Sequence, residues 1–203
     1  MADYQSVAPT TLALTLQDCK RHLNVTSTED DALITTHIKA ATNMLENRFN
    51  RCFVKQTRIL KFDDFNDTKY MHTDKYGRRR IYPPRSPLSS VSSIARLTST
   101  GGTSTLPTSD YVVSTGDKPG FVGESYNATW PDVYAQPNSV TVTYVAGHST
   151  VSGGVPEHVK QAIRMIVAHW YRQREGVLIG SISKEIEYGI DALMEGEAVM
   201  TYA

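Results

Sequence analysis

This sequence has little of what marks exported, membrane-spanning or disulfide-stapled proteins. Its 203 residues contain two cysteines, Cys19 and Cys52, which stand far apart and form no CxxC pair. Neither a zinc site nor a disulfide framework is indicated, and a reducing compartment fits. No run of about eighteen apolar residues occurs, and the N-terminus lacks a basic region followed by an apolar stretch, so we expect neither a membrane span nor a classical export signal.

The sequence also lacks an excess of either charge. Twenty-one basic and twenty-one acidic residues cancel, so no net field favours nucleic acid, a membrane surface or an acidic substrate as partner. Any such contact has to be local. The dense basic run is Arg78-Arg79-Arg80, beside Tyr76 and Tyr82. These arginines are candidates to contact a phosphate backbone or an acidic protein surface.

Recognisable catalytic patterns are missing as well. There is no GxSxG, no HExxH, no P-loop and no GxGxxG after a strand. His148 and His158 offer two metal ligands without a third in register, and the cluster of Asp63, Asp64 and Asp67 lacks the glycine and glutamate of an EF-hand loop. We expect no enzyme, no metal and no cofactor. A hydrolase or nucleic-acid-processing enzyme that uses these residues is the alternative.

The strongest periodic signal in the chain is the segment 156–175. Its defining apolar residues recur at spacings of four, three and four: Val159, Ile163, Ile166 and Trp170. This spacing predicts a helix with Trp170 fully buried on its central line. More than half of its circumference is apolar, whereas a surface helix needs a stripe only somewhat wider than ~100°. The helix therefore either runs through the middle of its domain or packs on another chain with one side.

This helix and the chain that follows it supply the candidates for an interface with another subunit or a partner. The candidate residues are Met165, Val167, Tyr171, Arg172, Leu178, Ile179, Met200 and Tyr202. The segment from Val177 is apolar but interrupted by glycines, which favours an adaptable strap that orders on binding. We expect it to dock on a partner protein. The alternative is a terminal helix folded back on its own bundle through Ile190, Leu193 and Met194.

The hydrophobic period changes twice along the chain, and this change predicts the fold class. Helical spacing covers residues 15–23, 29–50, 156–175 and 190–197, whereas residues 52–147 contain short β-rich segments separated by turn residues. We predict an α+β protein, with a small helical bundle formed by both ends of the chain and an inserted, mainly antiparallel β domain. The expected boundaries are an N-terminal arm at 1–14, a discontinuous helical domain at 15–51 and 148–195, the β domain at 52–147, and a C-terminal docking tail at 196–203.

An ordered set of local motifs extends over about residues 12 to 195. The motifs are LTLQ at 14–17, DDALI at 30–34, PL at 87–88 with SV at 90–91 and Ile94, DYVV at 110–113, WP at 130–131, VTYVAG at 142–147, VP at 155–156, KQAI at 160–163 and HWY at 169–171. In this order they resemble the head–tail connector (head-completion adaptor) proteins of tailed bacteriophages and gene transfer agents.

The resemblance implies a structural virion protein without enzymatic activity. It implies a homo-oligomeric ring beneath the portal protein, with twelve subunits to match the portal. Such a ring extends the DNA channel used for genome ejection and receives a downstream stopper or tail-completion protein. It also implies assembly in the host cytoplasm, and it makes the portal the expected partner of the C-terminal strap. A ring subunit has two different faces buried on neighbours, which suits a helix with a wide apolar face. A monomeric DNA-binding module that relies on Arg78 to Arg80 is a further alternative.

Overall fold

The computed structural model describes residues 2–134, 136–173 and 184–197. These residues divide into two compact units. The helical unit comprises residues 9–54, 148–173 and 184–197, and the sheet unit comprises residues 2–8 and 55–147. The fold is α+β, with helices from both ends of the chain and antiparallel strands between them, as the changes of hydrophobic period predict.

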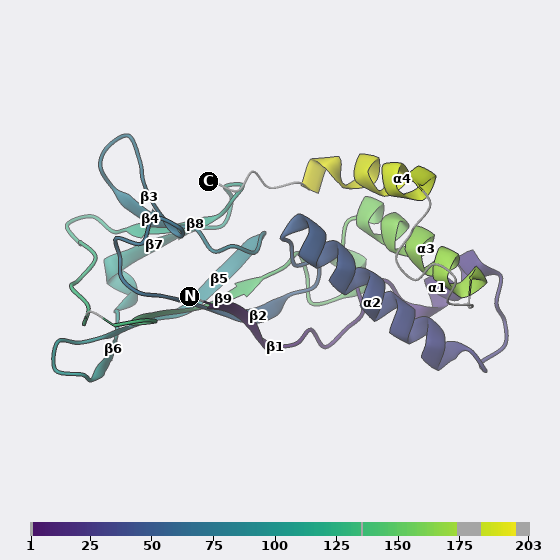
Figure 1. The fold of residues 1–203 in the computed structure, drawn as a ribbon, viewed down its shortest axis with the longest axis horizontal. Coiled ribbons are helices and arrows are strands. Elements are labelled where there is room, and N and C mark those ends of the chain that lie inside the picture. The colour runs from purple at the N-terminus through teal and green to yellow at the C-terminus, as the bar shows by residue number, and fades with distance from the viewer. Residues whose placement is uncertain (1, 135, 174–183, 198–203) are drawn as a thin grey trace. The chain divides into compact units, whose positions relative to one another are not determined.

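The helical unit is built from segments remote in the sequence (Figure 1). Its elements are α1 (Leu16–Leu23), α2 (Asp31–Phe49), the 3-10 turn η2 (Ser152–Gly154), α3 (Glu157–Arg172), α4 (Lys184–Met194) and the 3-10 turn η4 (Glu195–Glu197). α1 begins where Thr15 Oγ1 accepts a hydrogen bond from the N–H of Asp18 at 3.1 Å, as an N-cap residue does. No described helix is long and apolar enough to cross a membrane.

α3 lies at the centre of the helical unit. It packs against α1, α2 and α4, and its residues Val159, Ile163 and Ile166 are fully buried. Val167 is also fully buried in the same apolar core. The wide apolar face of α3 is therefore covered largely from within the unit. The placement of Val167 at an interface is wrong, because helices of its own unit already enclose its side chain.

Trp170 lies in the last turn of α3 and is only half-buried. Its ring stands edge-on to the ring of His37 in α2, with 5.9 Å between the centroids. The expectation of full burial is wrong because Trp170 sits near the helix end, where it packs against the edge of the core rather than inside it.

α4 folds back on the helical unit. Ile190 and Met194 are fully buried in the core, and Asp191 pairs with Arg48 of α2 at 2.8 Å. Figure 1 shows α4, in yellow, alongside α3. For residues 184–197 the structure therefore has the folded-back helix and not a docking strap. The apolar spacing of Ile190 and Met194 buries one face of the helix despite the glycines around it.

The sheet unit contains two antiparallel sheets among its described strands. Their strand orders are β1-β2-β9-β5-β6 and β3-β4-β8-β7. Residues of β2 and β9 alternate between buried and half-buried, the period of two expected for a sheet with one face inside. The strands are β1 (Ala2–Val7), β2 (Gln56–Phe62), β3 (Met71–Thr73), β4 (Arg79–Ile81), β5 (Leu88–Leu97), β6 (Thr103–Thr105), β7 (Tyr111–Ser114), β8 (Phe121–Glu124) and β9 (Val140–Ala146).

The expected loose arm at residues 1–14 is in part an edge strand. β1 pairs antiparallel with β2, and the side chain of Asp3 attaches β1 to residues of β2 and β9. The Asp3 carboxylate accepts hydrogen bonds from Arg58 Nη2 at 2.6 Å and from the Tyr144 hydroxyl at 2.8 Å. Charge-assisted bonds of this kind are among the stronger ones in proteins. The sequence of β1 is polar, so its order depends on distant partners that no local pattern reveals.

We predict that Ile166→Ala destabilises the protein more than Trp170→Ala. Truncating a fully buried isoleucine leaves a cavity and costs about 2–5 kcal/mol of unfolding free energy, whereas the half-buried Trp170 leaves a site open to water. Urea denaturation followed by circular dichroism measures both variants. An equal or larger loss for Trp170→Ala would place the indole ring inside the core.

Candidate functional site

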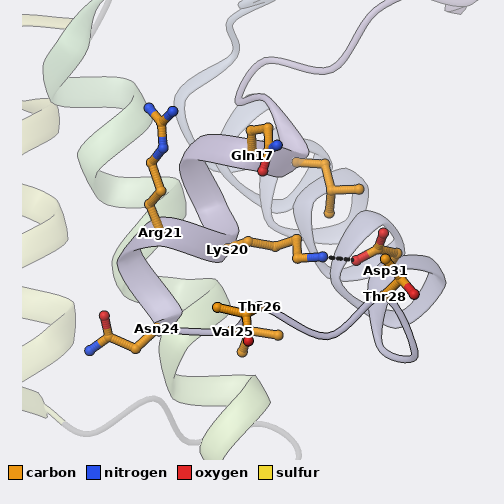
Figure 2. A pocket seen from close by; sticks show the side chains of 9 residues that line it. Gln17, Lys20, Arg21, Asn24, Val25, Thr26, Thr28 and Asp31 are labelled. Carbon is orange, nitrogen blue, oxygen red and sulfur yellow. Dashed lines mark hydrogen bonds and ion pairs between the residues drawn. The ribbon is translucent and has the colours of Figure 1, made fainter.

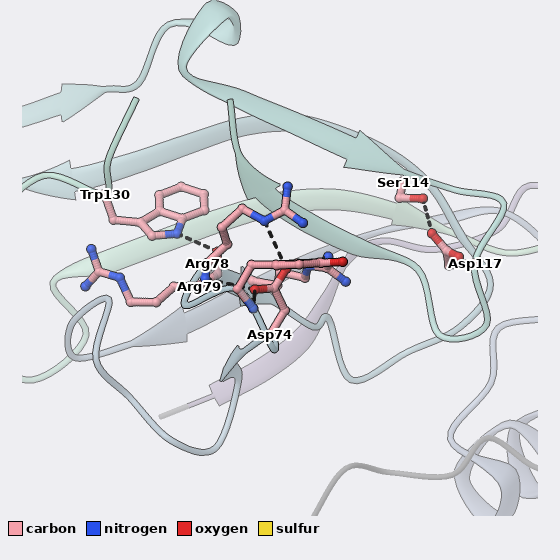
Figure 3. Close-up of polar contacts among 8 residues, drawn as sticks. Asp74, Arg78, Arg79, Ser114, Asp117 and Trp130 are labelled. Carbon is pink, nitrogen blue, oxygen red and sulfur yellow. Dashed lines mark hydrogen bonds and ion pairs between the residues drawn. The ribbon is translucent and has the colours of Figure 1, made fainter. Parts of the chain in front are cut away.

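The arginine run lies on the hairpin of β3 and β4, and Asp74 organises its turn (Figure 3). Asp74 Oδ1 accepts hydrogen bonds from the N–H groups of Tyr76 at 2.8 Å and Arg78 at 2.9 Å. Its Oδ2 pairs with Arg78 Nε at 3.0 Å and Arg80 Nη2 at 2.8 Å. Although burial acts in the opposite direction, the N–H groups of Arg78 and Tyr76 and the charge of Arg78 lower the pKa of Asp74. One carboxylate thus aligns two arginines.

Arg79 makes contacts within the sheet unit. Its Nη2 lies 3.3 Å from Glu124 Oε1, and its carbonyl accepts a hydrogen bond from Trp130 Nε1 at 3.0 Å. The Trp130 ring stacks on Phe65 with 4.8 Å between centroids. Arg78, by contrast, keeps 56% of its side chain exposed. Of the three arginines, Arg78 is the best placed to meet a partner.

A hollow of about 480 Å³ opens beside these arginines. Gly123 of β8 lies among its lining residues, in register with Arg80 of β4 on one side and Val112 of β7 on the other. The Arg80 guanidinium lies 4.3 Å from the centroid of the Phe121 ring, and Tyr126 is 93% exposed. We call this surface the basic hollow, because it combines cationic and aromatic groups.

A second hollow, of about 740 Å³, lies in the helical unit between α1, the turn after it and the start of α2 (Figure 2). Lys20 reaches across it and its Nζ pairs with Asp31 Oδ1 at 2.5 Å. Asn24 turns the chain here in a left-handed conformation. Lys20 and Asp31 are engaged with each other and Arg21 lies 3.7 Å from Asp18, so the hollow is a groove in the bundle surface without an assembled catalytic set among its described lining residues.

The acidic cluster near residue 63 stabilises turns. Asp64 Oδ1 accepts the N–H of Asn66 at 2.6 Å, and Asp67 Oδ1 accepts the N–H of Lys69 at 2.9 Å. Asp63 Oδ1 accepts the N–H of Asn138 at 2.9 Å. These carboxylates bind neighbouring backbone rather than converging on one point. No group of three or more His, Cys, Asp or Glu side chains in the described ranges is arranged to hold a metal ion.

The α3 interface candidates fall in different environments. Tyr171 is half-buried, and its hydroxyl donates to Asp30 Oδ2 at 2.6 Å. Met165 is half-buried against α4, since a Cβ on Gly189 would lie 3.0 Å from its Cε. Arg172 is exposed. The remaining candidates lie outside the described residues: Leu178, Ile179, Met200 and Tyr202.

His148 and His158 converge on a carboxylate that sequence reasoning missed. Glu197 of η4 lies 3.3 Å from His158 Nε2 and 3.7 Å from His148 Nε2. Arg51, which follows α2, approaches the same carboxylate at 2.5 Å. The side chains of Arg51 and Glu197 are only 3% and 9% exposed. We call these four residues the Glu197 cluster.

The electrostatics of the Glu197 cluster favour an ionised carboxylate. The contact with His148 lowers the pKa of Glu197 most, burial opposes it, and the charges of Arg51, His148 and His158 add to the lowering, which brings the pKa to about 2. Burial lowers the pKa of Arg51 while Glu197 opposes that change. The Arg51 guanidinium already pairs with the Glu197 carboxylate, which a metal ion would need as a ligand. The cluster is therefore an ionic tie and not a metal centre.

Glu197 also revises the expectation for the tail at 196–203. The first described residues of that segment, 196 and 197, are part of the helical unit, where Glu197 is held by its buried ion pair. The sequence drew attention to the two histidines, for which a metal role was considered and not expected, but it had no signal for Arg51 or Glu197. A lone glutamate near a chain end reads as solvated, since burial of such a group depends on a partner brought close by folding.

Solved structures of gene transfer agent particles share this fold. A chain in the neck of an empty GTA particle, computed with C6 symmetry, matches with a TM-score of 0.75 at 17% identity, covering 100% of this chain and 98% of that chain. Chains in the virion of a native gene transfer agent particle and in the neck of a native GTA particle computed with C12 symmetry match equally, at 18% identity and the same coverage. No curated protein matches the chain significantly.

The chain therefore shares its α+β fold, with helices from both chain ends, with chains of gene transfer agent particles. The model of the family described as "Head completion protein" matches residues 13–178, and the chain belongs to that family. The resemblance to head–tail connectors drawn from local motifs is confirmed. The role of the chain is accordingly structural, at the connection between head and tail.

We predict that Glu197→Gln lowers the unfolding free energy at pH 7 by about 3 kcal/mol, because it leaves the buried Arg51 without its counter-charge. The depressed pKa of Glu197 makes its stabilisation complete above the ordinary value of 4.5 and lost as the pH falls toward about 2. Urea denaturation as a function of pH measures this. The neighbouring exposed glutamate gives the control, Glu195→Gln, which should be neutral. Equal stability of the two variants at pH 7 would show that the ion pair between Arg51 and Glu197 does not stabilise the fold.

Proposed function

We propose that this protein forms a ring beneath the portal of a tailed phage or related particle, extends the DNA channel and joins the head to the next connector or tail component. The observation that carries the proposal is the family match over residues 13–178 together with a fold shared over the full chain with a neck protein. That neck was computed with C12 symmetry. This symmetry supports twelve subunits. We also propose the portal protein and a stopper or tail-completion protein as partners, and assembly in the host cytoplasm, on the ground of the family match.

Ring contacts have to come from residues that the subunit does not bury for itself. In a ring each subunit meets its neighbours through two different faces. Arg172 is exposed and Met165 and Tyr171 are half-buried on α3, so these three are the described candidates for an inter-subunit or portal contact. Leu178, Ile179, Met200 and Tyr202 remain proposed contacts because their side chains are apolar or aromatic.

The proposed stoichiometry is tested by mass. The purified chain of 22.6 kDa and its mixture with the portal protein of the same particle are measured by native mass spectrometry. We expect twelve copies added to one portal ring, and fewer in Arg172→Glu, because a reversed charge on an exposed face disfavours the contact. The melting temperature of Arg172→Glu should equal that of wild type. A chain that stays monomeric with intact portal would contradict the ring.

The basic hollow is the proposed contact for packaged DNA. The segment 74–80 carries four cationic residues against one carboxylate, Asp74, so the field is positive here in a chain with no net charge. Arg78 is the exposed member, while Arg79 is tied to Glu124. Exposed arginines bind phosphates through counterion release, which makes the affinity salt-dependent.

We predict that Arg78→Ala weakens duplex DNA binding by the assembled ring and reduces the slope of log affinity against log salt by about one. Fluorescence anisotropy of a labelled duplex over a salt series measures this. Lys39→Ala, at an exposed position of α2 in the other unit, is the control and should change neither quantity. If Arg78→Ala leaves the DNA affinity unchanged but weakens attachment to the downstream protein, the basic hollow is instead a contact for an acidic protein surface.

A further inference from the structure

The Glu197 cluster joins segments that are far apart in the sequence. Arg51 follows α2, His148 follows β9, His158 lies in the first turn of α3, and Glu197 ends η4. Glu197 is the member supplied by the C-terminal segment. Its ionic contacts therefore bear directly on whether η4 stays closed on the helical unit.

Arg51 supplies the constant part of this attachment. A guanidinium stays protonated across the physiological range, and it lies 2.5 Å from the Glu197 carboxylate. Glu46 of α2 contacts the backbone on both sides of Cys52: its Oε1 accepts the N–H of Phe53 at 2.7 Å. The carbonyl of Glu46 accepts the N–H of Arg51 at 3.0 Å. The backbone next to Arg51 is thus fixed, and its side chain is directed to Glu197.

His148 and His158 supply the pH-dependent part of this attachment. Their Nε2 atoms are buried and, in the described part of the chain, have no well-aligned hydrogen bond. Their side chains are nevertheless 23% and 39% exposed, so each ring has an edge in water and a nitrogen facing the carboxylate. Solvent can protonate the rings while the resulting charge acts on a buried group.

Protonation of either histidine places an N–H donor and a positive charge against Glu197. In a partly desolvated site this attraction is stronger than at the surface. Histidine side chains in general change charge between about pH 5 and 8, which is the range in which the attachment should vary.

We propose that the Glu197 cluster is a proton-controlled latch, which holds η4 tightly when His148 or His158 is protonated and lets it open more often when both are neutral. Arg51 keeps the latch from opening fully at high pH. The latch thereby sets how firmly η4 is held on the helical unit. This inference does not depend on the ring or on DNA binding.

Hydrogen exchange measured by mass spectrometry on the full chain tests the latch. The readout is the protection factor of the peptide 190–197, corrected for the intrinsic pH dependence of exchange. We expect it to fall several-fold from pH 5.5 to pH 8.5, because the positive charge of the imidazolium beside Glu197 is lost. A peptide from α2, residues 34–45, should keep constant protection, which shows that the change is local.

Substitutions in the Glu197 cluster distinguish an effect of histidine protonation from an effect of side-chain packing. His148→Gln with His158→Gln should abolish the pH dependence, while His22→Gln, at an exposed position on α1, should keep it. Glu197→Gln should lower protection at every pH and also remove the dependence. Constant wild-type protection across the pH range, or a pH dependence that survives in the double histidine variant, would overturn the proposal. Loss of the dependence on adding EDTA would also overturn it, since a bound metal would then be responsible.

Discussion

The helical unit depends on the burial of α3. This helix is apolar over most of its circumference, and neither end of the chain carries enough helix to cover it alone. α1 and α2 come from the N-terminal part and α4 from the C-terminal part, and all three pack against α3. Burial of Val159, Ile163, Ile166 and Val167 is therefore possible only when both ends of the chain meet. The strands between them are left to form a unit with its own core.

Near each end of the chain the described structure has a buried ion pair. Asp3 joins β1 to Arg58 in the sheet unit, and Glu197 joins η4 to Arg51 in the helical unit. A buried pair adds little stability over well-packed apolar groups, yet it penalises strongly any arrangement that separates its members. Such pairs therefore specify where otherwise polar segments lie. This is a useful property for η4, whose three residues (EGE) include no apolar side chain to direct them.

A connector must keep its subunit intact while offering surfaces to several neighbours. The core of the helical unit is buried by its own helices, so the proposed contacts between subunits are assigned to residues at its margin, such as the exposed Arg172. In the sheet unit the cationic and aromatic groups of the basic hollow are held in place by Asp74 and Phe121. The chain has no net charge, so its electrostatic specificity resides in such local arrangements and not in a general attraction to DNA.

The sequence by itself determined the helices, the antiparallel middle region and the family, because hydrophobic period and ordered motifs are local properties. The spacing of four apolar residues predicted α3, and the change of hydrophobic period at Cys52 predicted where the β region begins. Only the tertiary structure decided that Val167 is internal, that Trp170 is half-buried, that residues 2–7 form a strand and that His148 and His158 face Glu197. The physical reason is that each of these depends on distances between residues far apart in the chain. Burial of an ionic or polar group is favourable only when its partner is present, and the local sequence around Asp3 or Glu197 does not contain that partner.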